Sequence, residues 1–256
     1  MKYEIIDFHT HPFIEKTQIL GNHKEYVNDD CKSILYELKK AGISKFVGSV
    51  ISTLKEDNAM KICNDAALML SKIYKSDYIP GFTVDARFVE ESKNEIDRAI
   101  SEGINLIGEL VPYHYGWKYS DEGFSKILDY CDGKRLIFSL HTNYDEIDTM
   151  SRLAKEHPNI TFVFAHPGEI NQLQKHIETM KNTPNVYLDL SGTGLFRYGM
   201  LKRLVCEVGA DRILFGTDYP ICNPGMYVGG VDYEDITEEE KKLIFSENAK
   251  RILGLK

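Results

Sequence analysis

Short runs of apolar residues alternate along this chain with longer stretches in which apolar positions recur every three or four residues. The short runs are rich in β-branched and aromatic residues, which predicts β-strands. Most of them are almost continuously apolar, as is typical of parallel strands that are buried on both faces. The predicted strands are residues 3–8, 45–51, 78–84, 105–110, 136–140, 161–165, 186–190 and 213–216.

The longer stretches predict amphipathic helices between these strands. In residues 31–42, for example, Ile34, Leu35 and Leu38 share one helical face, and Gly42 provides a stop signal. The predicted helices are residues 31–42, 57–74, 91–103, 121–133, 144–157, 169–181, 200–210 and 237–254. Eight strands alternating with eight helices predict an α/β protein with the (β/α)8 TIM-barrel fold.

The alternation runs through the chain without a Pro/Ser/Gly-rich linker or a low-complexity tract. We therefore expect residues 1–256 to form one barrel domain. An open, doubly wound sheet is the structural alternative. No GxGxxG motif follows the first strand, which disfavours the dinucleotide-binding form of that alternative.

Composition and charge narrow the classes of partner. The chain is 43% hydrophobic and 27% charged, with a formal net charge of −8, which is typical of a globular protein without a large basic surface for nucleic acid. Its five cysteines form no CxxC pair, which favours reduced thiols and a cytoplasmic location. No leader-like or membrane-spanning apolar run is present. We expect a small-molecule substrate, no membrane or nucleic-acid partner, and leave a homodimer open.

Polar residues that can bind metal lie at or just beyond the ends of five of the predicted strands. They are His9, His11, Glu109, His141, His166 and Asp218. Residues just beyond the strands of a β/α barrel converge on one mouth. Alternate residues of a strand face the same side, so the two histidines of the His-x-His motif can point at the same cation.

Each of these residues also has a simpler interpretation. His9 and His11 can open a loop, a histidine after an apolar strand is often a hydrogen-bonded core residue, and Asp218 can form a turn before Pro220. Their joint occurrence at strand ends favours a metal centre. Imidazole and carboxylate donors predict one or two divalent cations, zinc above all, with manganese, iron or nickel as alternatives.

The two carboxylates, Asp218 and Glu109, each have more than one possible role. The eighth strand of a closed barrel lies beside the first, so Asp218 is expected near His9 and His11, either as a ligand or as the general base for metal-bound water. Glu109 either bridges two cations, orients a ligand, or pairs with an arginine such as Arg87 or Arg197.

The segments IIDFHTHPF, FVFAHPG, VYLDLSG, ILFGTDYP and SENAKRILG resemble the amidohydrolase superfamily, and in particular its amidohydrolase-related (amidohydrolase 2) branch. That branch includes hydrolases and nonoxidative decarboxylases similar to aminocarboxymuconate semialdehyde decarboxylase. The resemblance implies two metal patterns. In the mononuclear one, His9, His11, Asp218 and His141 hold a cation and His166 is the adjacent acid, base or electrophile. In the binuclear one, His141 and His166 hold a second cation and Glu109 bridges.

We expect a metal-dependent hydrolase that cleaves an ester, amide or related bond, with Asp218 and His166 as catalytic residues. The chain is shorter than typical decarboxylases of the branch, which favours hydrolysis. A decarboxylase in which protonated His166 delivers a proton to carbon is the first alternative, and a noncatalytic metal- or ligand-binding barrel is the second. The aromatic segment 112–120 either selects substrate or packs against a helix, and His157 and His176 are expected to be structural.

Overall fold

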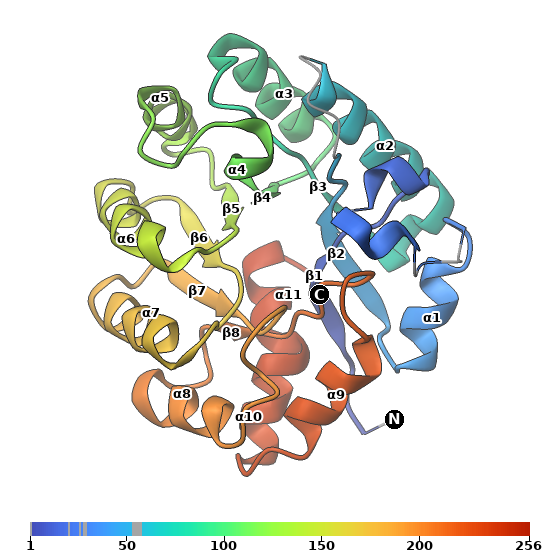
Figure 1. The fold of residues 1–256 in the computed structure, drawn as a ribbon, viewed down its shortest axis with the longest axis vertical. Helices are drawn as coiled ribbons and strands as arrows, with labels where there is room; N and C mark the ends of the chain where they lie inside the picture. Colours follow the sequence, from blue (N-terminus) through green and yellow to red (C-terminus); the bar gives the residue numbers. More distant parts are fainter. Residues whose placement is uncertain (1, 20, 26, 28–29, 53–57) are drawn as a thin grey trace.

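Eight parallel strands form the centre of the molecule, and helices surround them (Figure 1). The computed structural model describes residues 2–19, 21–25, 27, 30–52 and 58–256. All eight predicted strands are present close to their predicted positions, although the first runs to Thr10. The strands are β1 (Ile6–Thr10), β2 (Lys45–Ser49), β3 (Tyr78–Gly81), β4 (Leu106–Leu110), β5 (Ile137–Leu140), β6 (Thr161–Phe164), β7 (Val186–Asp189) and β8 (Ile213–Leu214).

Backbone contacts close these strands into a barrel. Strands β1 to β3 form one parallel sheet and β4 to β8 another. A bridge between Phe82 and Ile107 joins the two sheets beyond β3, and a bridge between Thr10 and Tyr219 joins β1 to the segment after β8. The first and last strands are therefore neighbours, which confirms the predicted TIM barrel and rules out the open sheet.

The predicted crossover helices are present around the barrel, and the described residues form two further helices. The helices are α1 (Ile34–Lys40), α2 (Ala59–Tyr74), α3 (Val89–Ser101), α4 (Pro112–Tyr115), α5 (Glu122–Cys131), α6 (Ile147–Glu156), α7 (Ile170–Asn182), α8 (Met200–Val208), α9 (Pro224–Asp232), α10 (Glu238–Lys242) and α11 (Asn248–Leu253). Helices α4 and α9 were not predicted. A π-helical turn, Leu243–Glu247, joins α10 to α11, and 3-10 turns span Lys16–Gln18, Gly21–Glu25, Lys75–Asp77 and Tyr144–Glu146. Among the described residues, no helix is long and apolar enough to cross a membrane.

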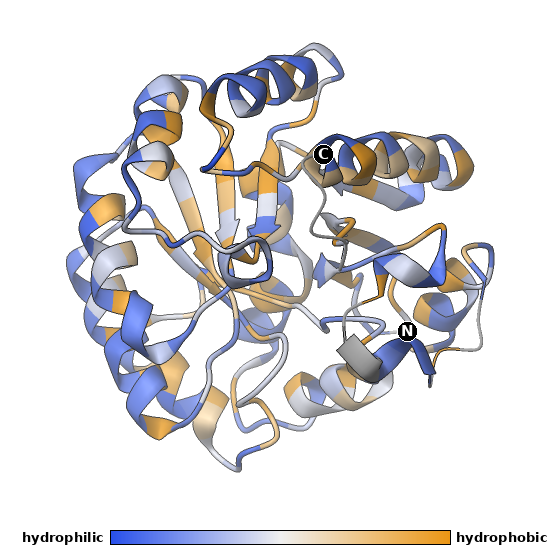
Figure 2. Cartoon of the chain, turned by 45° about the horizontal axis from the view of Figure 1, so that its top comes forward, coloured by the Kyte–Doolittle hydropathy of each residue, from blue (hydrophilic) through white to orange (hydrophobic). Residues whose placement is uncertain are grey.

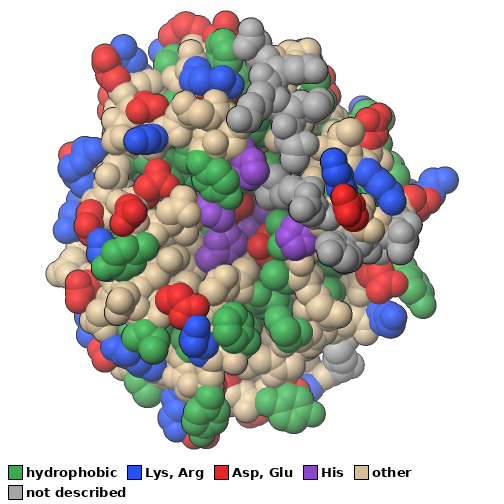
Figure 3. Space-filling model, viewed as in Figure 1, with side chains coloured by type: hydrophobic (Ala, Val, Ile, Leu, Met, Phe, Trp, Pro, Cys, Tyr) green, Lys and Arg blue, Asp and Glu red, His purple; other side chains and the backbone are tan. Residues whose placement is uncertain are grey.

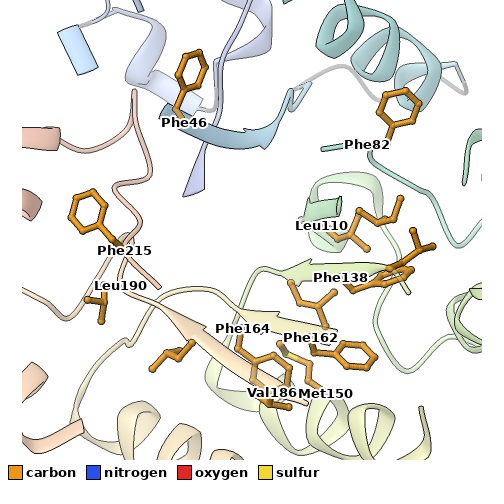
Figure 4. Packing of buried hydrophobic residues seen from close by; sticks show 14 of the residues in the cluster. Phe46, Phe82, Leu110, Phe138, Met150, Phe162, Phe164, Val186, Leu190 and Phe215 are labelled. Carbon is orange, nitrogen blue, oxygen red and sulfur yellow. The ribbon is translucent and has the colours of Figure 1, made fainter. Parts of the chain in front are cut away.

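The hydrophobic core has two layers, because alternate residues of each strand point to opposite faces. Phe46, Phe138 and Phe162 pack outward against the helices (Figure 4). Val47, Ile137 and the other members of a smaller cluster fill the barrel interior. Both faces of each strand are thus buried, which accounts for the nearly continuous apolar runs, and Figure 2 shows the polar residues mainly on the outer faces of the helices.

The C-terminal helix α11 covers one end of the barrel and leaves the other end open. Its Ala249 belongs to the interior cluster, and Ile252 and Leu253 pack against that cluster. This helix therefore covers the end at which the strands begin. The opposite end, where the strands finish, is left for polar side chains.

Candidate metal centre

All six predicted metal-binding residues meet at the carboxyl end of the strands. Histidine side chains gather at the centre of this face in the space-filling view (Figure 3). The exposed fractions of the side chains are graded: 1% for His9, 3% for His11 and Glu109, 9% for Asp218, 11% for His166 and 19% for His141. The centre therefore has an inner part that is shielded from solvent, with Asp218 at its edge, and an outer part that is more exposed.

The inner part brings four donor atoms together. The Nε2 atoms of His9 and His11 are 3.1 Å apart, and Oε2 of Glu109 lies 3.5 Å from the first and 3.3 Å from the second. Asp218 contributes Oδ1, at 3.7 Å from His9 Nε2 and 3.3 Å from His11 Nε2. These contacts join the end of β1 to β4 and to the segment after β8.

The outer part uses the other oxygen of the same glutamate. Oε1 of Glu109 lies 3.2 Å from His141 Nδ1 and 3.3 Å from His166 Nε2. The two imidazole nitrogens are themselves 3.1 Å apart. Glu109 thus stands between two groups of histidines and directs one carboxylate oxygen at each.

Both groups have the spacing that a metal ion requires. Donor atoms about 2.1 Å from a common cation lie roughly 3.0 to 3.4 Å from one another in octahedral or tetrahedral geometry. The outer contacts of 3.1 to 3.3 Å fall within that range. Three inner contacts, of 3.1 to 3.3 Å, fall within it as well, and the two that His9 makes with Glu109 and Asp218, at 3.5 and 3.7 Å, are slightly longer. His9, His11 and Asp218 form one compact set of donors, and His9, Glu109 and His166 form another. The residues present therefore fit a divalent cation.

The charges in the centre also favour a cation. Burial opposes protonation of His9, yet the charges of Asp189 and Glu109 raise its pKa well above the usual value. Burial likewise opposes protonation of His11, but hydrogen bonds to Asp218 and Glu109 raise its pKa to about 9. Burial disfavours the charged form of Glu109, but the charges of His9 and His141 hold its pKa well below the usual value. Buried carboxylates thus attract positive charge to this point, which a bound cation can supply.

Two site residues adopt an unusual backbone conformation. His166 and Asp218 both have φ near 66°, in the left-handed region that residues other than glycine rarely occupy. Asp218 is held there by its backbone N–H, which donates to His9 O at 2.8 Å. The carbonyl of His166 accepts a hydrogen bond from Nε2 of His176 at 3.2 Å, so the buried His176 supports the site from behind.

Two further polar residues contact the site and are absent from the sequence-based prediction. Asp189 is the last residue of β7 and Ser191 lies two residues beyond it. Both are fully buried, and they contact His9 and His166 respectively. They obey the same rule that identified the other six, because they are polar residues at the end of an apolar strand. Neither is a histidine, and no spacing in the sequence links them to His9 or His166.

The aromatic segment 112–120 divides between the two predicted roles. Trp117 and Tyr119 are buried and pack with Phe124, which is the packing role. Tyr113 is half exposed, and its ring centroid lies 5.3 Å from that of His141 at the outer part of the centre. Of the arginines considered as partners for Glu109, Arg87 pairs with Asp85 and Arg197 with Glu169.

Comparisons with protein families and with individual proteins point to the same family. A family model described as amidohydrolase matches residues 6–255. Gamma-resorcylate decarboxylase from Polaromonas sp. (strain JS666) is 30% identical over 124 residues, which are 41% of this chain and 37% of the relative. The enzyme of the same name from Rhizobium sp. (strain MTP-10005) is 28% identical over 122 residues, again 37% of its length. The matches thus span little more than a third of these relatives.

Solved structures agree on the fold over almost the whole chain. A 2,6-dihydroxybenzoate decarboxylase complexed with 2,6-dihydroxybenzoate has a TM-score of 0.77 and 16% identity, and the match covers 99% of this chain and 100% of that one. A TIM-barrel protein from Bordetella bronchiseptica has a TM-score of 0.78 and 21% identity, with 98% of both chains covered. The dihydroxybenzoic acid decarboxylase from Polaromonas sp. JS666, solved with bound manganese and 2-nitroresorcinol, has a TM-score of 0.69 and 16% identity, and covers 98% of this chain and 97% of that one.

These comparisons correct the predicted chemistry. The chain is an enzyme of the amidohydrolase fold with donors for a divalent metal, but the prediction of hydrolysis is wrong, because the named relatives are decarboxylases. The error came from chain length: short loops after the strands do not encode which bond is broken. The preference for zinc is not confirmed either, because a related structure carries manganese.

Proposed function

This chain belongs to the amidohydrolase family, and on that premise we propose that it is a metal-dependent nonoxidative decarboxylase of hydroxylated aromatic acids. The observation that carries the proposal is the local similarity to two gamma-resorcylate decarboxylases. The graded centre supports it, because inner donors are separated from outer side chains that a substrate can reach.

We assign the inner donors to the cation. His9, His11 and Asp218 would hold it together with Oε2 of Glu109, given their mutual distances of 3.1 to 3.7 Å. When bound, the cation supplies positive charge that stabilises the oxygens of an anionic substrate. Manganese is the first ion to test, since a related decarboxylase structure contains it.

The substrate would meet the outer part of the centre. His166 and His141 are its more exposed histidines, and the half-exposed ring of Tyr113 stands beside His141. Offset or edge-on contacts between aromatic rings are favourable, so these rings suit an aromatic acid better than an aliphatic one. A small, flat, anionic substrate is the class that fits.

The reaction then requires one proton at one carbon atom. The bond between the ring carbon and the carboxyl carbon breaks, its electron pair remains on the ring carbon, and carbon dioxide leaves. We assign delivery of the proton to Nε2 of His166, which points into the centre while its Nδ1 faces Ser191. Hydroxyl groups on the ring favour this step because they donate electron density to the carbon that takes the proton.

The proposal is tested by incubating manganese-loaded protein with 2,6-dihydroxybenzoate and a panel of other hydroxybenzoates. We expect carbon dioxide and the decarboxylated phenol in equal amounts, loss of turnover after chelation, and recovery on adding MnCl2. His166→Asn should lower turnover by a factor of about 10² to 10⁴, the usual contribution of a positioned acid.

His157→Asn provides a matched control. His157 is a buried histidine between α6 and β6, at the other end of the strands, and its nearest described charged partner is Asp129 at 3.9 Å. This variant should retain wild-type turnover. The proposal fails if manganese-loaded protein releases no carbon dioxide from any acid of the panel, or if His166→Asn turns over as fast as His157→Asn.

A further inference from the structure

A buried carboxylate connects the inner and outer parts of the centre from behind. Oδ2 of Asp189 lies 2.9 Å from Nδ1 of His9. Its other oxygen, Oδ1, accepts hydrogen bonds from the backbone N–H of Ser191 at 2.9 Å and from the hydroxyl of Ser191. That hydroxyl oxygen lies 3.0 Å from Nδ1 of His166. Asp189 and Ser191 are both fully buried.

The direction of each hydrogen bond follows from what the groups can donate. A carboxylate only accepts, so His9 must donate its Nδ1–H to Asp189, and Ser191 must donate its single hydroxyl proton to the same residue. The oxygen of Ser191 is then free to accept from His166 Nδ1–H. Both histidines therefore present Nε2 to the centre, although His9 lies in β1 and His166 lies just beyond β6.

Packing restricts the rings as well. A methyl group added at Gly192 would lie 2.4 Å from Nδ1 of His166, and one added at Gly216 would lie 2.8 Å from Cβ of His9. The ring of His166 is thus packed against Gly192, Cβ of His9 is packed against Gly216, and both rings are hydrogen-bonded at Nδ1. His11 is oriented separately, by the carbonyl of Ser49 at 3.2 Å from its Nδ1.

We propose that Asp189, acting directly on His9 and through Ser191 on His166, is a positioning residue that sets the orientation of a metal-binding histidine and of the proton donor at the same time. This inference rests on the proposed function for the role of His166. It does not need that function for the role of His9. A carboxylate behind a metal-binding histidine typically changes metal affinity when it is removed.

Asp189 acts through two arms: its hydrogen bond with His9, and the hydrogen bonds that run through Ser191 to His166. Asp189→Ala removes both arms, whereas Ser191→Ala removes only the arm to His166. Metal-free wild-type protein and both variants would be titrated with MnCl2, with free manganese measured by electron paramagnetic resonance and turnover measured separately at saturating manganese. Asn64→Ala is the control, because Asn64 is equally buried and makes its hydrogen bonds to Thr83 and Glu95 instead.

We expect Asp189→Ala to raise the dissociation constant for manganese by about 10- to 100-fold. Ser191→Ala should leave that constant within about threefold of wild type but lower kcat roughly tenfold or more, with KM almost unchanged, because a misoriented acid affects only the proton-transfer step. Asn64→Ala should lower the melting temperature without changing either quantity.

Wild-type manganese affinity in a folded Asp189→Ala variant would overturn the inference. If that variant does not fold, Asp189→Asn replaces it, since the amide keeps the volume but loses the charge that faces His9. A Ser191→Ala variant with wild-type kcat would remove the second arm. If the wild type binds manganese but decarboxylates nothing, the proposed function fails, and the titration still tests the arm to His9.

Discussion

Gly216 lies two residues beyond β8 and has no polar side chain, yet its substitution should weaken metal binding. A methyl group added there would lie 2.8 Å from Cβ of His9 and 3.2 Å from Oδ1 of Asp189. Carbon atoms in favourable contact are about 3.5 to 4.0 Å apart, so Gly216→Ala must move His9 by roughly 0.7 Å or more. Metal sites tolerate donor displacements of only about 0.2 Å. We expect a dissociation constant for manganese at least about tenfold higher, the lower end of the range for disturbed supporting contacts.

The same substitution should cost stability, because overpacking a filled interior destabilises by about 1 to 3 kcal/mol. Both quantities are measurable on one preparation, by manganese titration of metal-free protein and by urea denaturation. Gly229→Ala is the matched control, since a methyl group at Gly229 in α9 meets no described atom within 4 Å. The reasoning is refuted if Gly216→Ala binds manganese as tightly as Gly229→Ala does.

Three further predictions follow from the centre and the core. His11→Ala removes one of the inner donors and should leave the purified protein with far less than one manganese per chain by elemental analysis; full occupancy would exclude His11 as a ligand. Glu109→Gln removes the charge that faces four histidines, so we expect weaker manganese binding in the same titration, and an unchanged dissociation constant would make Glu109 a bystander. Phe138→Ala empties a fully buried site and should lower the free energy of unfolding by about 3 to 5 kcal/mol in urea denaturation; a loss below 1 kcal/mol would contradict the assigned core.

The fold could be predicted because its signals are local and repeated. Each strand is a short apolar run and each crossover helix has its own periodicity, so eight rounds support one another. The short helix α4 gave no such signal, since four residues are too few for a period. Helix α9 does have a local start signal in the sequence: Asn223 caps it by accepting from the N–H groups of Gly225 and Met226, and Pro224 occupies its first turn.

The position of the six strand-end residues could also be predicted, because parallel strands of a barrel end at one mouth. What lies behind them could not. Asp189 reaches His9 across 180 positions of sequence, and no spacing rule connects the two. The contact exists only because barrel closure brings the last strands back beside the first, so the supporting carboxylate is visible in the fold and not in a motif.

The depth of each side chain explains why the metal centre was predicted and the reaction was not. His9, His11 and Glu109 are almost completely shielded, so they can hold a cation but cannot touch a substrate. A cation held in this way stabilises charge on any oxygen bound to it, whether the bond that breaks is C–N, C–O or C–C. Which bond breaks therefore depends on the outer side chains, and above all on whether His166 exchanges a proton with a water molecule or with a carbon atom. The rule that finds polar residues at strand ends assigns all six to one class, because it says nothing about how deeply each side chain is buried. Substitution at His166 and at Ser191, which leave the inner donors in place, is therefore the most direct way to separate the chemistry from the metal.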